Sequence, residues 1–172
     1  MARFTHPAIF DDSGLSQISP FSASYFSSQD QSATTSGNIQ AHTFNNIDWE
    51  HGIQLVDNSK ITMLHSGKYN IAFSDQLHYT GGGGSGSTVN IWLAKNGTAM
   101  QDTNTKAVIT ANNPYYVAAW NFFVNAAAND YYQLMWSADN INIKLESEAS
   151  TGSGANIHPS IPSVILTVNQ IG

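Results

Sequence analysis

The chain contains no cysteine, so neither a disulfide nor a thiolate metal site can contribute to its stability. Charged residues are also scarce. They make up 10% of the 172 residues, whereas about 25% is usual for a soluble domain. Only six Lys and Arg residues are present, and the formal net charge is -6. Partners that require basic patches, such as nucleic acids and anionic membranes, are therefore disfavoured.

Two further absences concern export and membrane insertion. The N-terminal sequence MARFTHPAIFDDSG has no basic segment followed by an apolar run, so no secretory signal peptide is predicted. No stretch approaches the roughly 18 consecutive apolar residues that a membrane span needs. A protein of this kind can still reach the outside of a cell by lysis.

Patterns that would indicate catalysis or metal binding are also missing. The chain has no Gly-x-Ser-x-Gly elbow. Glu146 and Glu148 fall on the same face of one strand, whereas an acid and base pair should face each other across a cleft. His65 and His78 could meet across strands, but the histidines show no metal-binding spacing. The sequence therefore predicts no enzyme activity, no cofactor and no metal site. The histidines are His6, His42, His51, His65, His78 and His158.

Residues that favour turns and strands dominate instead. Ser, Asn and Thr together supply 50 of the 172 residues, and Asn and Ser favour turns while Thr favours strands. From Ile39 onward, short apolar runs alternate with turn signals. The segment Tyr69 to Tyr79 shows the clearest period of two, and Asn96-Gly97 predicts a hairpin turn. We predict an all-β protein, an antiparallel β-sandwich or jelly roll with about eight to ten strands.

The first 36 residues lack sustained periodicity, so we divide the chain into an N-terminal arm (1–36) and a jelly-roll domain (37–172). Such an arm could dock on a neighbouring subunit or scaffold, or it could be a disordered terminus. Its aromatic residues favour docking, because disordered segments contain few of them. The predicted docking residues are Phe4, Ile9, Phe10, Phe21, Tyr25 and Phe26.

The stretch Tyr115 to Ser137 is the most apolar part of the chain and predicts two strands joined by a short turn. Neither face of these strands is plainly polar, which is typical of strands covered on both sides. One face would be the core. The other would contact another subunit, unless the strand pair simply lies deep within one sandwich. The predicted oligomer-interface residues are Tyr116, Trp120, Phe122, Tyr132, Leu134 and Trp136.

Several short motifs resemble known jelly rolls. Ser66-Gly67-Lys68-Tyr69-Asn70-Ile71-Ala72-Phe73, Asn129-Asp130-Tyr131-Tyr132-Gln133-Leu134 and the final apolar strand look like the trimeric complement globular-head and tumour-necrosis-factor-like superfamily. The resemblance covers about residues 40–172. Asn129 stands where that family usually has Gly. If the resemblance holds, the terminal strand belongs to the inner sheet of a trimeric jelly roll.

A closer resemblance is to small phage and cyanophage virion proteins. It is carried by Ile91-Trp92-Leu93-Ala94-Lys95-Asn96-Gly97, by Tyr116-Val117-Ala118-Ala119-Trp120-Asn121-Phe122 and by Pro162-Ser163-Val164-Ile165-Leu166-Thr167. This resemblance implies a homotrimer on a virion, made in the host cytoplasm and released by lysis. Trimerisation would bury aromatic residues along a threefold axis.

The favoured function is therefore a structural phage virion protein, a homotrimeric capsid decoration (cement) protein that binds and stabilises the capsid surface. Its partners would be itself and the major capsid protein or another virion protein. The alternative is a receptor-binding head, or accessory component, of a tail fibre or spike that binds host surface glycans through Trp49, His51 and Tyr79. The decoration protein is favoured because no repetitive fibre shaft precedes the domain.

Overall fold

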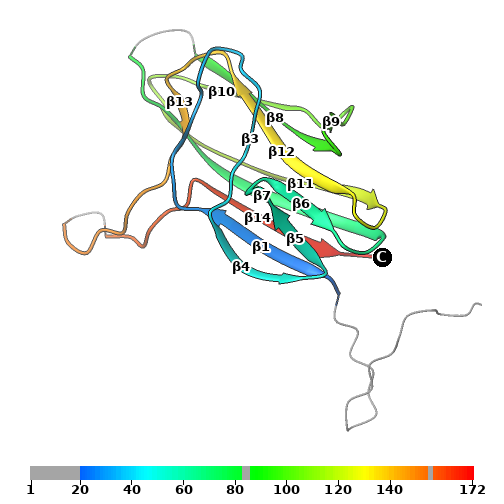
Figure 1. Cartoon of the computed structure of the whole chain (residues 1–172). Helices are drawn as coiled ribbons and strands as arrows, with labels where there is room; N and C mark the ends of the chain where they lie inside the picture. Colours follow the sequence, from blue (N-terminus) through cyan, green and yellow to red (C-terminus); the bar gives the residue numbers. More distant parts are fainter. Residues whose placement is uncertain (1–19, 83–85, 155–156) are drawn as a thin grey trace, which may run out of the picture.

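The computed structural model describes residues 20–82, 86–154 and 157–172, which form a sandwich of two antiparallel sheets and contain no helix (Figure 1). No segment of this described part is therefore a helix able to span a membrane. The first sheet, called the β7 sheet, contains β4 (Asn46–His51), β1 (Ser22–Ser27), β14 (Val164–Gln170), β7 (Gly67–Tyr79) and β11 (Tyr115–Ala126) in spatial order. Strand β13 (Ile143–Leu145) pairs with the last residues of β7, and β2 (Gln31–Ser32) pairs with β13.

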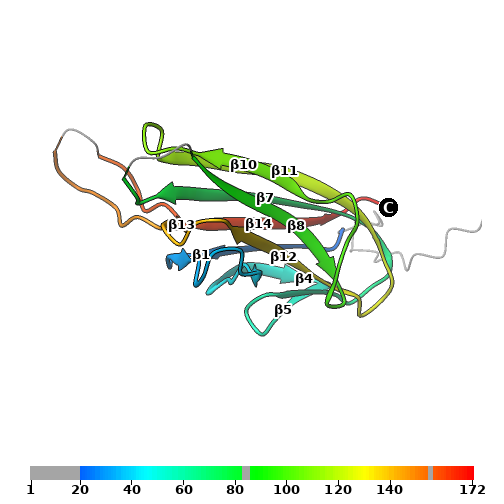
Figure 2. The same cartoon turned by 90° about the horizontal axis from the view of Figure 1, so that it is seen from above.

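The second sheet, called the β8 sheet, packs against the first and completes the jelly roll (Figure 2). It contains β5 (Ile53–Val56), β6 (Lys60–Met63), β12 (Tyr131–Ala138), β8 (Ser87–Lys95) and β10 (Thr105–Ile109) in spatial order, with β3 (Gln40–Ala41) beside β12 and β9 (Thr98–Ala99) beside β8. The predicted all-β antiparallel jelly roll is therefore confirmed.

The core between the sheets follows from the period-two pattern of the central strands. In β7, the odd-numbered residues Tyr69, Ile71 and Phe73 are buried, while the residues between them are partly exposed. The facing strand β12 contributes Leu134 and Trp136, which are fully buried. The alternation predicted for residues 69–79 is confirmed, because one face of β7 meets the opposite sheet and the other does not.

The strands predicted within Tyr115 to Ser137 exist, but they do not form a hairpin. Strand β11 pairs with β7 along its whole length, whereas β12 pairs with β8 in the other sheet. The turn between them crosses from sheet to sheet and is closed by the Asp130 carboxylate, which accepts a hydrogen bond from the Ala127 N–H at 2.8 Å. The apolar pattern indicated that both strands are covered, but it contained no information about which strand each one pairs with.

Another crossing between the sheets occurs at Gly52. Strand β4 lies in the β7 sheet and β5 lies in the β8 sheet. Gly52 has a φ of +71°, and a Cβ atom here would lie 2.2 Å from Cδ1 of Phe21. Both the backbone conformation and the close approach of Phe21 therefore require glycine.

The boundary predicted at residue 36 is wrong, because β1 is an internal strand of the β7 sheet. It pairs with β14 on one side and β4 on the other. Tyr25 is fully buried, and Phe21 stacks on His65 with ring centroids 4.0 Å apart. Phe21, Tyr25 and Phe26 therefore belong to the jelly roll. The polar serines between them made the short strand β1 difficult to recognise from the sequence. Phe4, Ile9 and Phe10 lie outside the described residues.

The first and last described segments meet at one end of the sandwich. The N–H of Gln170 donates to the carbonyl of Phe21, and the N–H of Lys68 donates to that of Gly172. The segment between β13 and β14 lies at the opposite end of the long axis, as both views show (Figures 1 and 2). The described chain therefore starts and finishes at one end of the sandwich. We call the opposite end, where the segment between β13 and β14 lies, the loop end.

Candidate functional site: the uncharged face of the β7 sheet

The side of the β7 sheet that points away from the core is the candidate interaction surface, and we call its central part the open face. It is formed by alternate residues of three neighbouring strands. These residues are Asn70, Ala72, Ser74 and Gln76 of β7, Tyr115, Val117, Ala119, Asn121 and Phe123 of β11, and Ile165 and Thr167 of β14.

Strand register places these side chains in rows across the sheet. Ser74 pairs with Ile165 on one side and Ala119 on the other. The next row contains Ala72 and Asn121. The centre of the open face is therefore made of small or neutral side chains, with no charged residue among its members. Depletion of charge is the compositional mark of the core of a protein interface.

Large apolar side chains lie along the β11 margin of the open face. Phe123 is 70% exposed, Val117 56% and Tyr115 58%. Strand β11 is also the edge of the sheet, since among the described residues it pairs only with β7. A 12-residue edge strand with exposed aromatic residues invites pairing or association unless something covers it.

Charged side chains gather at the loop end of the open face. Nδ1 of His78 lies 2.8 Å from Oε2 of Glu146, and the His78 ring stacks on Tyr115 with centroids 4.3 Å apart. Lys144 Nζ lies 2.7 Å from Glu146 and 2.8 Å from Asp30, and the hydrogen bonds to Asp30 and then Glu146 raise the pKa of Lys144. The open face thus has a neutral centre and a charged rim at the loop end, while the exposed Lys68, which pairs with Asn125, lies at the other end.

The interface residues predicted from sequence lie mostly on the opposite side of their strands. Tyr132, Leu134 and Trp136 are fully buried in the core of one chain, so they have no surface to offer another subunit, and this part of the prediction is wrong. Trp120 and Phe122 are partly buried and pack against that core, while Tyr116 is 42% exposed.

The face of β11 that points outward could have been recognised from two polar residues. Asn121 and Asn125 share the odd-numbered face with Val117 and Phe123, and both are exposed. The even-numbered face contains the bulkier Trp120 and Phe122, and its polar groups are the Tyr116 hydroxyl and the buried indole N–H of Trp120. The predicted interface residues were chosen because their aromatic side chains are large, whereas the asparagines indicated which face of β11 points to solvent.

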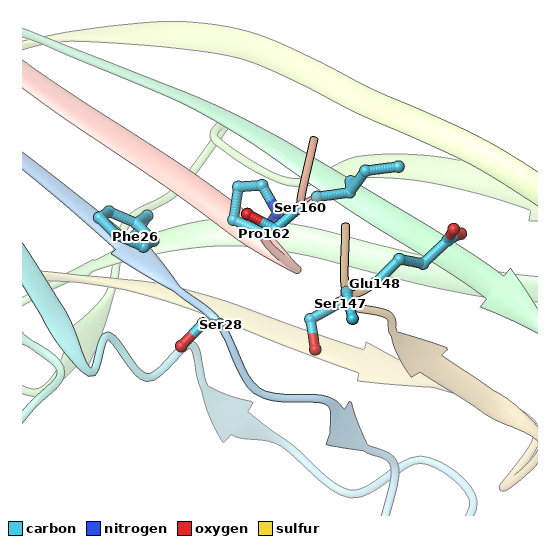
Figure 3. Close-up of a pocket in the computed structure, with 8 residues that line it drawn as sticks. Phe26, Ser28, Ser147, Glu148, Ser160 and Pro162 are labelled. Atoms are coloured by element: carbon cyan, nitrogen blue, oxygen red, sulfur yellow. The ribbon is translucent and has the colours of Figure 1, made fainter. Parts of the chain in front are cut away.

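A pocket of about 310 Å³ lies beside the open face, where β1 ends and the segment between β13 and β14 passes (Figure 3). Phe26, Ile161 and Pro162 supply its apolar lining. Glu148 points away from Phe26 (Figure 3), and its carboxylate lies 3.7 Å from the His158 ring. The remaining lining residues are Ser28, Ser147, Ala149 and Ser160.

Two serines of this pocket, Ser147 and Ser28, form hydrogen bonds to Asp30 and Asn45 and not to a histidine. The Ser147 hydroxyl donates to Asp30, and the Ser28 hydroxyl accepts from the Asn45 side chain. A catalytic serine needs a base within hydrogen-bond reach and a third group to orient that base. Both hydroxyls instead connect loops to strands.

The proposed glycan-stacking residues are not brought together. Trp49 and His51 lie on β4, with Trp49 51% exposed, whereas Tyr79 lies at the loop end of β7 and is only 7% exposed. His65 and His78 do not meet either, because they flank opposite ends of the 13-residue strand β7. Within the described residues, no group of three or more His, Asp or Glu could hold a metal ion.

Comparisons with known proteins identify the fold. No protein-family model and no curated protein sequence matches the chain. Among solved structures, crystal structures of murine APRIL match with TM-scores of 0.55 at pH 8.0, 0.57 at pH 5.0 and 0.54 at pH 8.5. The sequence identities are 10%, 7% and 7%, and each match covers 89% of this chain and 100% of the other. The chain thus shares a tumour-necrosis-factor-like jelly roll with these proteins.

Proposed function

We propose that this chain is a structural virion protein that assembles as a homotrimer through the open face and decorates the capsid surface. The observation that carries self-association is the open face itself. It combines an uncharged centre with Tyr115, Val117 and Phe123, three large side chains that are more than half exposed in the single chain. A monomeric protein rarely leaves such a patch uncovered.

A second copy of the same chain is the partner that suits this face best. Self-association needs no complementary charge, and the open face has none in its centre. The jelly rolls that the sequence resembles are trimers, and the shared fold is consistent with that arrangement. A closed threefold assembly would also cover the β11 edge in every copy, so that no free edge remains for further growth.

Placement on a virion is supported by the sequence resemblance to phage virion proteins. In a parallel trimer, all three chains would begin their described parts at the same end of the assembly. Residues 1–19, with Phe4, Ile9 and Phe10, would then reach the capsid from that end, while the loop end would point outward. The major capsid protein is the proposed partner of those three residues.

Self-association is tested by placing a carboxylate on the open face. Val117→Asp should convert a trimer into a folded monomer, because a buried unpaired charge costs several kcal/mol in each copy of the interface. Val108→Asp is the matched control, since Val108 is also 56% exposed but lies on β10 of the β8 sheet. Sedimentation velocity gives the oligomeric state. A wild-type chain that stays monomeric at micromolar concentration, or a control that dissociates equally, contradicts the proposal.

The virion role is tested by counting copies in purified particles of the virus that encodes the chain. A copy number in simple ratio to the major capsid protein supports a decoration protein. A few trimers per particle would support the alternative, a receptor-binding component of a tail fibre or spike. Absence from the particle would contradict both.

A further inference from the structure

A groove of about 400 Å³ crosses the solvent side of the β8 sheet, in the layer that does not contain the open face. Its floor is Asn90 and Trp92 of β8 together with Ser137 of β12. One wall is the loop 99–104 and the other is the segment 37–39. The groove therefore lies between two loops that approach the sheet from opposite sides.

The floor follows from the alternation of buried and partly exposed residues from Ser87 to Leu93 in β8. Val89, Ile91 and Leu93 are fully buried in the core, so Asn90 and Trp92 must point to the solvent side. Trp92 is only partly covered there. A large aromatic side chain that the core does not need, placed at the bottom of a groove, is a feature of ligand-binding surfaces.

Hydrogen bonds hold the first wall in place. The N–H of Met100 donates to the carbonyl of Leu93 at 2.9 Å. The Thr103 hydroxyl accepts from the N–H of Leu93 at 3.2 Å and donates to the carbonyl of Met100 at 2.8 Å. The Asn104 side chain donates to Oδ1 of Asn90 at 3.2 Å, which joins wall to floor. This wall therefore exists before any ligand binds.

The second wall is fixed to β12 and the turn that follows it. The N–H of Gly37 donates to the carbonyl of Ala138 at 2.7 Å, and the Ser36 hydroxyl donates to the carbonyl of Asp139, also at 2.7 Å. Ile39, which is 61% exposed, lines this side of the groove. A preformed groove loses little conformational entropy when a ligand is bound.

The chemistry of the lining is aromatic and neutral polar, with one carboxylate. Asn90, Asn104, Gln101 and Ser137 offer amide and hydroxyl groups, each able both to donate and to accept hydrogen bonds. Asp102 adds an acceptor. Among the residues that the structure describes, no Lys, Arg or His lines the groove, so a phosphorylated, sulfated or acidic ligand would meet a carboxylate without a compensating cation from them.

We propose that this groove binds a neutral saccharide chain. The C–H groups on one face of a sugar ring carry partial positive charge and would pack on the electron-rich face of Trp92. The hydroxyls at the edge of the same ring require paired donors and acceptors, which the amides of Asn90, Gln101 and Asn104 and the Asp102 carboxylate supply. A fully apolar ligand would leave these groups without partners at a cost in free energy.

The saccharide proposal is independent of the homotrimer proposal, because the groove and the open face lie on different sheets. Binding should therefore be the same in the wild-type protein and in the Val117→Asp variant, whichever oligomeric state each has. Loss of the trimer would leave the groove intact, and an empty groove would not affect the trimer.

The test is a titration of the full chain with a panel of short neutral oligosaccharides, built from glucose, galactose, mannose or N-acetylglucosamine, and a sulfated oligosaccharide for comparison. Saturation-transfer NMR and calorimetry detect millimolar binding. At least one neutral oligosaccharide should bind, and Trp92→Ala should weaken it by about tenfold or more. Trp49→Ala, which removes an exposed tryptophan from the other sheet, is the matched control and should bind as the wild type does.

A second variant covers the outcome in which Trp92→Ala fails to fold. Gln101→Ala changes one side chain of the loop wall and removes no buried atom of the core, and it should weaken binding several-fold while the melting temperature stays unchanged. The proposal is overturned if no neutral oligosaccharide binds at millimolar concentration. It is also overturned if Trp49→Ala abolishes binding that Trp92→Ala and Gln101→Ala retain, or if only the sulfated ligand binds.

Discussion

His42 and Asp75 face each other inside the sandwich, with 2.9 Å between Nε2 of the imidazole and Oδ2 of the carboxylate, and both side chains are inaccessible to solvent. Nδ1 of His42 lies 3.0 Å from the carbonyl oxygen of Leu134. That oxygen can only accept, so Nδ1 donates to it and the Nε2 position faces Asp75. Burial raises the pKa of Asp75, and His42 offsets this only in part.

Removing the Asp75 carboxyl group should be strongly destabilising, because it leaves Nε2 of His42 buried without a partner. We expect Asp75→Ala to lower the free energy of unfolding by about 1–3 kcal/mol. Asp75→Asn keeps the shape of the side chain and a hydrogen-bonding group, so it should lower the free energy of unfolding clearly less than Asp75→Ala does. Urea unfolding curves of the two variants give the comparison. Equal losses would show that the His42 contact contributes little.

Asp130 should make stability fall in acid. Hydrogen bonds from Lys95, from Asn96 and from the N–H of Ala127 lower the pKa of its carboxyl from 3.8 to about 2. A carboxyl with a lowered pKa in the folded state stabilises the fold above its unfolded pKa and loses that effect as the pH falls towards the folded value. The urea midpoint should therefore drop between about pH 4 and pH 2.

The same acid titration of Asp130→Asn isolates the contribution of this side chain. The variant should be less stable than the wild type at pH 5, and the difference should shrink by pH 2, because protonation removes the charge in the wild type as well. A difference that stays constant over this range would contradict the assignment to Asp130.

Trp120 and Phe123 should differ in what they contribute to the stability of one chain. Trp120 packs edge-on against Phe73, with ring centroids 4.6 Å apart, whereas Phe123 is 70% exposed. We expect Trp120→Ala to cost up to about 3 kcal/mol and Phe123→Ala less than about 0.5 kcal/mol. The free energy of unfolding is measured for both variants in the Val117→Asp background, so that subunit contacts do not contribute to it. A reversed order would mean that the two faces of β11 are assigned the wrong way round.

Gly52→Ala should lower the melting temperature, since the residue has a φ of +71° and its added Cβ would meet the Phe21 ring. The expected loss is about 1–3 kcal/mol. Gly152→Ala is the control, because no atom lies within 4 Å of a Cβ placed there. Differential scanning calorimetry of the two variants tests this. Similar melting temperatures would show that the bend at Gly52 relaxes without cost.

The fold class could be predicted from local patterns because each of those patterns has a local cause. The alternation in residues 69–79 reflects one buried and one open face of β7. The Asn96-Gly97 turn appears as predicted, with φ values of 50° and 80° and a Lys95 to Thr98 pairing beside it. The final apolar run became β14, which lies between β1 and β7.

Strand pairing and the position of the interaction surface could not be derived in the same way. The strands β11 and β12 are adjacent in sequence and equally apolar, yet the turn at 127–130 sends them to different sheets. The groove residues Trp92 and Asn104 come from a strand and a separate loop, and their proximity depends on the Thr103 and Met100 contacts with Leu93. Periodicity describes which face of a strand is buried, but it does not describe what lies beside the other face.

The position of β14 between β1 and β7 also determines when the sheet can be completed during synthesis. β14 is the last strand in chain order, and its partners lie about 140 and 95 residues earlier in the chain. Until β14 has been made, β1 and β7 cannot occupy their final places, and the apolar residues of β11 are on a sheet that is still open. Such long-range pairing slows folding and prolongs the exposure of apolar edges. Newly made chains are therefore most prone to aggregate just before the final strand is added, and slower synthesis would lengthen that interval.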